Sequence, residues 1–182
     1  MRGSFGWKVA AVLAAASAAL VFGAFGAQAQ NAFHGIGFVK GCDSPTKVGD
    51  PYICSYQILN VVDTAHDTIK ITGLTDVVHS AGGDVPSGNI LPSLQLVFSG
   101  PTVTCTGGSG SGTAADPYIG ATSCTLPFGT SIETNGFSHY TVQPGDFGLP
   151  AHQLTDDAAL NWTDLCTGIS GNCNPNPQTA TA

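Results

Sequence analysis

Aspartate and histidine are the side chains of this sequence best suited to hold a metal ion. No two of its five histidines lie two or four residues apart, the spacings that bring two ligands to one face of a strand or a helix. The densest group is Asp63-Thr-Ala-His66-Asp67, whose carboxylates suit calcium. Aspartate-rich turns without a metal are commoner, because Asp and Thr also satisfy nearby backbone groups. We therefore expect no cofactor. A calcium site at Asp63 and Asp67 is the alternative, and Asp43 and Asp50 are a second candidate pair of calcium ligands. The histidines are His34, His66, His79, His139 and His152.

The sequence motifs that mark an enzyme are missing. Ser109 has Gly107 before it but Ser111 after it, where a nucleophile elbow needs glycine on both sides. Gly35-Ile36-Gly37 is followed by Lys40, where a dinucleotide-binding loop needs a third glycine. Two carboxylates for glycoside hydrolysis stay an open alternative, because only their separation in space identifies them. We expect no catalytic residue and no enzymatic activity.

Trp162 is the one tryptophan beyond the first 29 residues. An exposed ring there would be a weak candidate platform for a carbohydrate. A lone tryptophan in a β-sandwich more often belongs to the core, and we favour that position.

Residues 1–29 have the parts of a secretory signal peptide. Arg2 and Lys8 are followed by an uncharged stretch from Val9 to Ala27, and Ala27-Gln28-Ala29 fits a cleavage site. We expect cleavage after Ala29 and an extracellular or cell-surface location. An uncleaved anchor is the alternative, since the stretch is near the lower length limit for a membrane span.

The charge of the exported part excludes two classes of partner. Residues 30–182 contain three lysines, no arginine and all twelve acidic residues, a formal charge of −9. Such a chain cannot neutralise a run of phosphates, so we expect no nucleic-acid partner. It is also repelled by anionic lipid, so membrane contact is expected only through the signal peptide before cleavage.

All six cysteines follow the expected cleavage site, as in exported disulfide-bonded proteins. Zinc is disfavoured because no short C-x-x-C knuckle exists. Six cysteines allow 15 connectivities, and sequence alone does not choose among them. Their spacing suggests three near pairs: Cys42 with Cys54, Cys105 with Cys124, and Cys166 with Cys173.

Short alternating stretches separated by Gly and Pro predict an all-β fold, an antiparallel Ig-like β-sandwich with disulfide-stapled loops. The clearest strand is 52–60, with Tyr52, Cys54, Tyr56 and Ile58 on one face. Shorter strands are expected over 31–40, 67–72 with a continuation through 74–78, 94–98, 102–106, 121–126 and 137–142. Residues 79–92 are expected to form a loop, 107–117 a flexible Gly/Ser loop, and Asn135-Gly136 a hairpin turn. Residues 151–165 allow a short helix or a strand.

We therefore expect residues 30–182 to form one enlarged β-sandwich domain. The chain ends in strand-compatible residues without a charged tail or an anchor, and we lean towards its being the N-terminal part of a longer protein.

Val48-Gly49-Asp50-Pro51-Tyr52, the alternating strand that follows and Asn60 at its end resemble the opening of the conserved-repeat domains of bacterial surface proteins, the domain-of-unknown-function-11 family. The stretch from Ile69 to Thr75-Asp76 resembles the family's second strand. Val77-Val78-His79 departs from the family's usual Leu-Pro, and the cysteines and residues 107–117 are additional. The resemblance implies an Ig-like sandwich in a secreted or surface protein and brings no catalytic residue.

We therefore expect a secreted or cell-surface structural or adhesive module with an unidentified protein or cell-surface partner. The alternatives are a module that binds a carbohydrate or a divalent cation and, third, a small exported hydrolase. An exposed Trp162 or stabilisation by calcium would favour the binding module, and histidines gathered in one cleft would favour the hydrolase.

Overall fold

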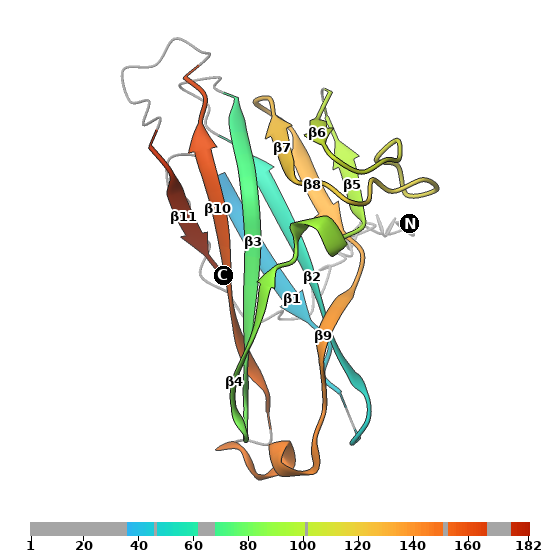
Figure 1. The fold of residues 1–182 in the computed structure, drawn as a ribbon, viewed down its shortest axis with the longest axis vertical. Coiled ribbons are helices and arrows are strands. Elements are labelled where there is room, and N and C mark those ends of the chain that lie inside the picture. Colours follow the sequence, from blue (N-terminus) through green and yellow to red (C-terminus); the bar gives the residue numbers. More distant parts are fainter. Residues whose placement is uncertain (1–35, 46, 62–67, 101, 151–152, 167–175) are drawn as a thin grey trace, which may run out of the picture.

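The computed structural model describes residues 36–45, 47–61, 68–100, 102–150, 153–166 and 176–182. Within them the chain forms two antiparallel β-sheets and two short 3-10 helices, which confirms the predicted all-β sandwich (Figure 1). No helix in these segments has the length and apolar character needed to span a membrane. The expected signal peptide lies outside the described residues.

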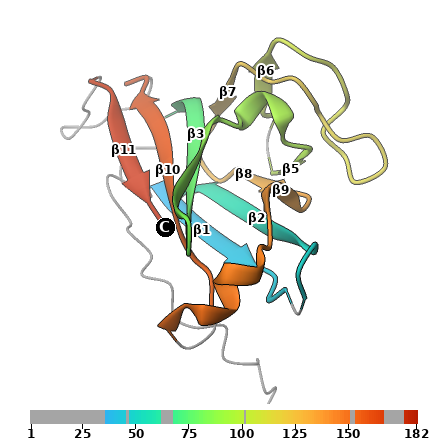
Figure 2. The same cartoon turned by 60° about the horizontal axis from the view of Figure 1, so that its bottom comes forward.

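The sheets are built from strands distant in sequence. The first sheet has the order β1 (Ile36–Cys42), β2 (Pro51–Asn60), β8 (Ser131–Thr134), β5 (Leu96–Ser99), and β9 (Phe137–Thr141) also pairs with β2. The second sheet has the order β11 (Gln178–Thr181), β10 (Thr155–Asp164), β3 (Ile69–Ser80), β7 (Ser123–Leu126), β6 (Thr104–Thr106), and β4 (Gly83–Asn89) also pairs with β3. The 3-10 helices are η1 (Leu91–Ser93) and η2 (Pro144–Gly148). Turning the molecule shows the two sheets as separate layers (Figure 2).

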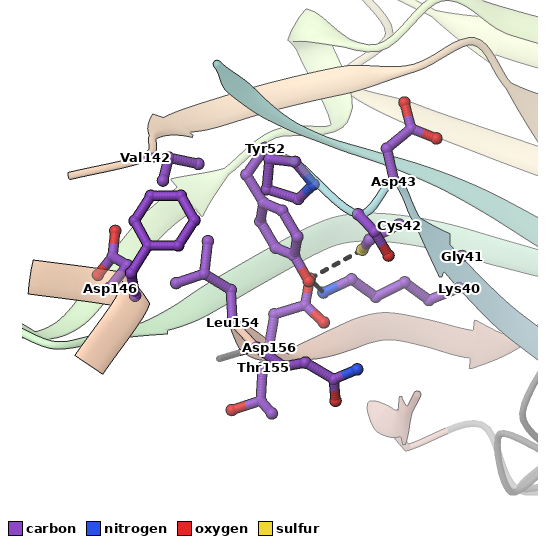
Figure 3. Close-up of a pocket in the computed structure, with 14 residues that line it drawn as sticks. Lys40, Gly41, Cys42, Asp43, Tyr52, Val142, Asp146, Leu154, Thr155 and Asp156 are labelled. Atoms are coloured by element: carbon purple, nitrogen blue, oxygen red, sulfur yellow. Dashed lines mark hydrogen bonds and ion pairs between the residues drawn. The ribbon is translucent and has the colours of Figure 1, made fainter. Parts of the chain in front are cut away.

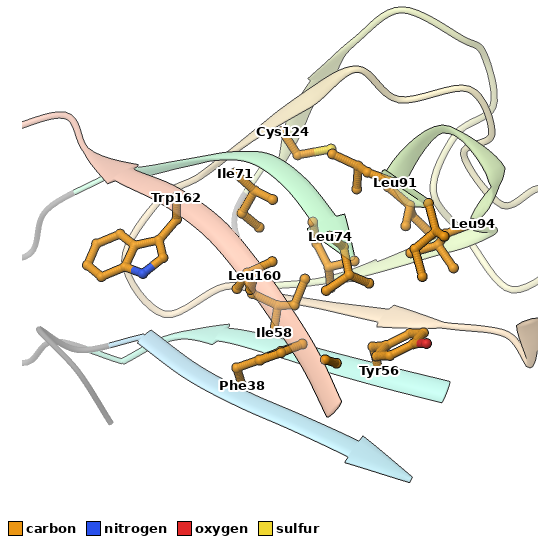
Figure 4. Packing of buried hydrophobic residues seen from close by; sticks show 14 of the residues in the cluster. Phe38, Tyr56, Ile58, Ile71, Leu74, Leu91, Leu94, Cys124, Leu160 and Trp162 are labelled. Carbon is orange, nitrogen blue, oxygen red and sulfur yellow. The ribbon is translucent and has the colours of Figure 1, made fainter. Parts of the chain in front are cut away.

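The core lies between the sheets and follows the alternation of the strands. In β2 the side chains Tyr52, Cys54, Tyr56 and Ile58 are all buried, as their spacing predicts. Phe38 and Ile58 from the first sheet face Ile71, Leu160 and neighbours from the second (Figure 4). Each such side chain contributes about 1.5–3 kcal/mol when it leaves water.

Trp162 is part of this core, with 1% of its surface exposed (Figure 4). It occupies the inward phase of β10 with Ala158 and Leu160. The core position favoured by the sequence is therefore correct, and the weak alternative of an exposed carbohydrate platform at Trp162 is wrong.

Two predicted connections have a different structure. The predicted loop 79–92 contains the end of β3, the whole of β4 and the start of η1. β4 tolerates Pro86 because a register shift, between Thr75 and Val77 of β3, breaks the regular ladder at this strand. The hairpin predicted at Asn135-Gly136 is also wrong, because β8 and β9 lie end to end along β2 instead of pairing with each other (Figure 1).

The ambiguous stretch 151–165 contains a strand: β10 pairs with β3 over ten positions, from Thr155 opposite His79 to Asp164 opposite Ile69. The alternative of a short helix is wrong, because alternate residues of this stretch complete the core between the sheets. The two expected strands 67–72 and 74–78 are one strand, β3.

Residues 107–117 are mostly exposed, as predicted, but their backbone is held by hydrogen bonds that a flexible linker would lack. Ser109 exchanges two backbone bonds with Ile119, and Thr113 exchanges two with Asp116. The glycines here allow close approach: a Cβ on Gly112, whose φ is +72°, would lie 2.0 Å from Cδ2 of Phe98. The Gly- and Ser-rich composition suggests flexibility because it does not reveal these hydrogen bonds and close contacts.

Replacing Gly112 by alanine should therefore be costly. We expect Gly112→Ala to lower the free energy of unfolding by about 2 kcal/mol or more, because the methyl group meets the Phe98 ring and the backbone has a left-handed conformation. Urea unfolding would measure it. Gly148→Ala is the matched control, since no heavy atom lies within 4 Å of its Cβ position and its φ is not left-handed. Equal losses in the two variants would contradict the packing role of Gly112.

Candidate functional site: a buried lysine between two carboxylates

Lys40 is a buried lysine in an otherwise apolar strand face. Ile36, Phe38 and Lys40 occupy the inward phase of β1, so the lysine points between the sheets with the two apolar residues. Only 3% of its side chain is exposed, whereas Lys47 is exposed and Lys70 is half-buried. Taking an ammonium out of water is costly unless it is paired and hydrogen-bonded, so its neighbours determine what this site can do.

Two aspartates of the opposite sheet supply that pairing. Nζ of Lys40 lies 2.5 Å from Oδ1 of Asp76 on β3 and 2.6 Å from Oδ2 of Asp156 on β10. The Asp76 side chain is 1% exposed and that of Asp156 is 12% exposed. The ion pairs therefore connect one sheet to the other across the core.

Two tyrosines of β2 complete the cluster. The Tyr56 hydroxyl donates a 2.6 Å hydrogen bond to Oδ2 of Asp76, and the Lys40 ammonium lies 5.9 Å from the centre of the Tyr56 ring. Tyr52 lies close enough to Asp156 for this carboxyl group to affect the pKa of its hydroxyl. Burial, followed by these carboxylates, raises the pKa of both tyrosines, so both remain hydrogen-bond donors at neutral pH. We call Lys40, Asp76, Asp156, Tyr52 and Tyr56 the lysine cluster.

The two carboxyl groups of the lysine cluster differ in their surroundings. Burial raises the pKa of Asp156 although the Lys40 ammonium opposes this shift, so its neutral form is favoured relative to an aspartate in water. Asp76 accepts on both oxygens, from Lys40 and from Tyr56, as an ionised carboxylate does. His139 on β9 also faces Asp76, with Nδ1 4.0 Å from Oδ2.

The Cys42–Cys54 disulfide covers one side of Asp156. Oδ2 of Asp156 lies 2.9 Å from Sγ of Cys42 and 3.1 Å from Sγ of Cys54. Both sulfur atoms belong to the disulfide and carry no hydrogen, so these are sulfur–oxygen contacts. The three residues have the spacing of a metal-ligand group, but the bonded sulfurs are not thiolates and are poor ligands for zinc.

A surface pocket of about 580 Å³ leads to this cluster (Figure 3). Lys40, Tyr52 and Asp156 line the pocket, as does Phe147 of η2. Asp76 does not line the pocket. Of the two carboxyl groups that contact the ammonium, the Asp156 group therefore faces the path to solvent.

The predicted cysteine pairs agree with the structure where it describes both partners. Cys42 and Cys54 face each other across β1 and β2, and Cys105 and Cys124 face each other across β6 and β7; both pairs are disulfide-bonded. Disulfides of this kind indicate an oxidising compartment. The pair Cys166–Cys173 includes Cys173, which lies outside the described residues.

The predicted metal and histidine positions form no common site in the part of the chain that the structure describes. Asp63, His66 and Asp67 lie outside that part, as do His34 and His152. His79 lies between Asp84 and Asp157 at the surface, whereas His139 faces the buried Asp76.

Sequence reasoning missed the lysine cluster, although a signal for it exists. Lys40, Asp76 and Asp156 each occupy the inward phase of a strand, where a charged residue needs a partner. One lysine and two aspartates, each on the core face of a different strand, would predict a buried cluster of charged groups.

Outside the lysine cluster, the buried carboxylate of Asp146 holds η2 to the sandwich. Asp146 accepts hydrogen bonds from the Tyr140 hydroxyl at 2.7 Å and from the backbone amides of Ala81 and Gln143 at 3.0 and 2.8 Å. Burial alone would raise the pKa of Asp146, but the three donated hydrogen bonds outweigh it and lower the pKa. Asp146 thus joins β9 and η2 to the turn between β3 and β4.

Removing this acceptor should destabilise the domain. We expect Asp146→Ala to reduce the free energy of unfolding by about 2–3 kcal/mol at neutral pH, because three donors lose their partner. In the unaltered protein this contribution is complete above the unfolded-state pKa of an aspartate and disappears as the pH falls through the lower pKa of the folded carboxyl. The difference between the protein and its variant should therefore shrink in acid, as urea unfolding at several pH values would show. Asp43→Asn, an exposed carboxylate at the same pocket, is the control; a difference for Asp146→Ala that stays constant with pH would contradict this account.

Comparison with protein-family models, with curated proteins and with solved structures found no match to this chain, so the site stands on its own geometry.

Proposed function

We propose that this chain is a secreted or cell-surface structural or adhesive module that performs no catalysis on an external substrate. The observation that carries the proposal is the set of cross-links that hold the β-sandwich together. Two disulfides each join neighbouring strands within one sheet, and the lysine cluster joins the two sheets to each other. Such cross-linking suits a domain that must keep its shape outside the cell.

Composition supports the same proposal. The signal-peptide pattern of residues 1–29 favours export, and the charge of −9 after cleavage keeps the domain soluble. The resemblance of residues 48–80 to bacterial surface repeats favours a role in which one module holds or presents others. The partner would be a protein or another component of the cell surface.

Export can be tested with the full chain expressed in a bacterium under its own first 29 residues. We expect intact mass analysis to find a mature protein beginning at Gln30 outside the cytoplasm, with its cysteines oxidised. Replacing Ala27 and Ala29 by bulky residues should block cleavage and serves as the control. A full-length chain in the cytoplasm with reduced thiols would contradict the proposal.

A binding module for a divalent cation or a small carbohydrate is the second candidate. It is favoured by the pocket of about 580 Å³, which combines the carboxyl groups of Asp43, Asp146 and Asp156 with the rings of Tyr52 and Phe147.

Thermal unfolding in the presence of calcium separates the two candidates. A structural module should melt at the same temperature with and without calcium, because only a ligand that binds the folded state stabilises it. A saturable rise in melting temperature would support the binding module. Asp63→Asn/Asp67→Asn would then test the calcium pair predicted from the sequence, and Asp43→Asn would test the pocket.

A further inference from the structure

The lysine cluster places an amine against a carboxyl group in an enclosed site. Nζ of Lys40 is 2.6 Å from an oxygen of Asp156, so it lies within about 4 Å of the carboxyl carbon one bond farther on. Both side chains are held: the lysine by two ion pairs, and the aspartate by Lys40 and the disulfide. Fixed reacting groups at such distances behave like reactants at very high effective concentration.

We propose that Lys40 and Asp156 condense in the folded protein to form an intramolecular amide bond between Nζ and Cγ, with Asp76 as the proton acceptor. The bond would link β1 of one sheet covalently to β10 of the other. This inference goes beyond the proposed function and is independent of it, since it concerns a modification that the chain makes to itself.

The reaction balances with the groups present. The Lys40 ammonium gives one proton to the Asp76 carboxylate, and the amine lone pair then attacks Cγ of neutral Asp156. The N–C bond forms, one C–O bond breaks, and the departing oxygen leaves as water with the acid's own proton and a second proton from the attacking nitrogen. The nitrogen keeps one hydrogen as an amide, Asp76 ends protonated, and no oxidant or reductant is required.

Asp156 and not Asp76 is the acyl partner for three reasons. Asp156 lines the pocket, which gives the departing water a path to solvent, whereas Asp76 does not. Asp76 accepts hydrogen bonds on both oxygens, from Lys40 and from Tyr56, which suits a base. Burial raises the pKa of Asp156 and so favours the neutral acid that an amine can attack.

Enclosure also favours the product. An ammonium and a carboxylate buried together both lose hydration, and their attraction repays this cost only in part. Condensation removes the charges of Lys40 and Asp76, because it leaves a neutral amide and a protonated Asp76, and it releases a water molecule into bulk solvent. The same burial that is costly for the ions therefore drives the reaction.

Mass spectrometry of the unaltered full chain tests the proposal. After reduction and alkylation of the cysteines, the protein purified from its folded state should be lighter than its sequence by the mass of one water. Fragmentation of a protease digest should find the peptide of Lys40 joined to that of Asp156, with no cleavage by trypsin after Lys40. A natively folded protein of full mass would overturn the proposal, and a link mapped to Asp76 would overturn the choice of acyl partner.

Variants separate the roles within the lysine cluster. Lys40→Arg and Asp156→Ala should keep their full mass, whereas Lys47→Arg, at an exposed lysine, should lose water as the unaltered protein does. Asp76→Asn is expected to condense about 100-fold more slowly, and so to be recovered largely at full mass, because an amide does not accept the proton. Condensation of Asp76→Asn at the unaltered rate would overturn the role of Asp76. Oxidation of Cys42 and Cys54 in each variant verifies its fold, and the measurement on the unaltered protein requires no variant.

Discussion

The buried ammonium of Lys40 is the constraint on which the arrangement of the two sheets depends. An ammonium in the interior is tolerable only if acceptors reach it from the strands that face it, and here both acceptors come from the opposite sheet. Side chains of a strand alternate between faces, so a slip of one residue in β3 or β10 would turn Asp76 or Asp156 away from the core. The charge therefore adds to the apolar alternation of these strands in fixing their register.

The disulfides contribute a different kind of restraint. Cys42–Cys54 and Cys105–Cys124 each join strands that are already hydrogen-bonded neighbours within one sheet. They reduce the freedom of the unfolded chain over short loops but place no covalent tie between the layers. Across the layers the described residues offer apolar packing, the lysine cluster and hydrogen bonds such as the one from the Asn60 side chain to the Leu126 carbonyl at 2.8 Å. Cys42–Cys54 belongs to both systems, because its sulfur atoms contact Asp156.

Features that depend on neighbours in sequence were predictable, and features that depend on strand pairing were not. The buried face of β2 and both fully described disulfides follow from spacing along the chain. The strand β4 did not, because Pro86 and its glycines suggest a loop until their pairing with β3 is known. Asn135-Gly136 has the composition of a hairpin turn, yet the strands on either side both pair with β2. Lys40, Asp76 and Asp156 are far apart in sequence, so only the packing of one sheet on the other brings them together.

The composition of the lysine cluster explains why its fully ionised form is unfavourable. Two carboxyl groups face one ammonium, so full ionisation would leave a net negative charge in the interior. The Tyr56 hydroxyl relieves this by donating to Asp76, and the raised pKa of Asp156, which burial causes, relieves it by favouring a proton there. A cluster with one excess acid, one amine and little water contains what amide formation requires: an electrophile without charge, a nucleophile and a base. Its electrostatic imbalance and its reactivity thus have the same physical origin.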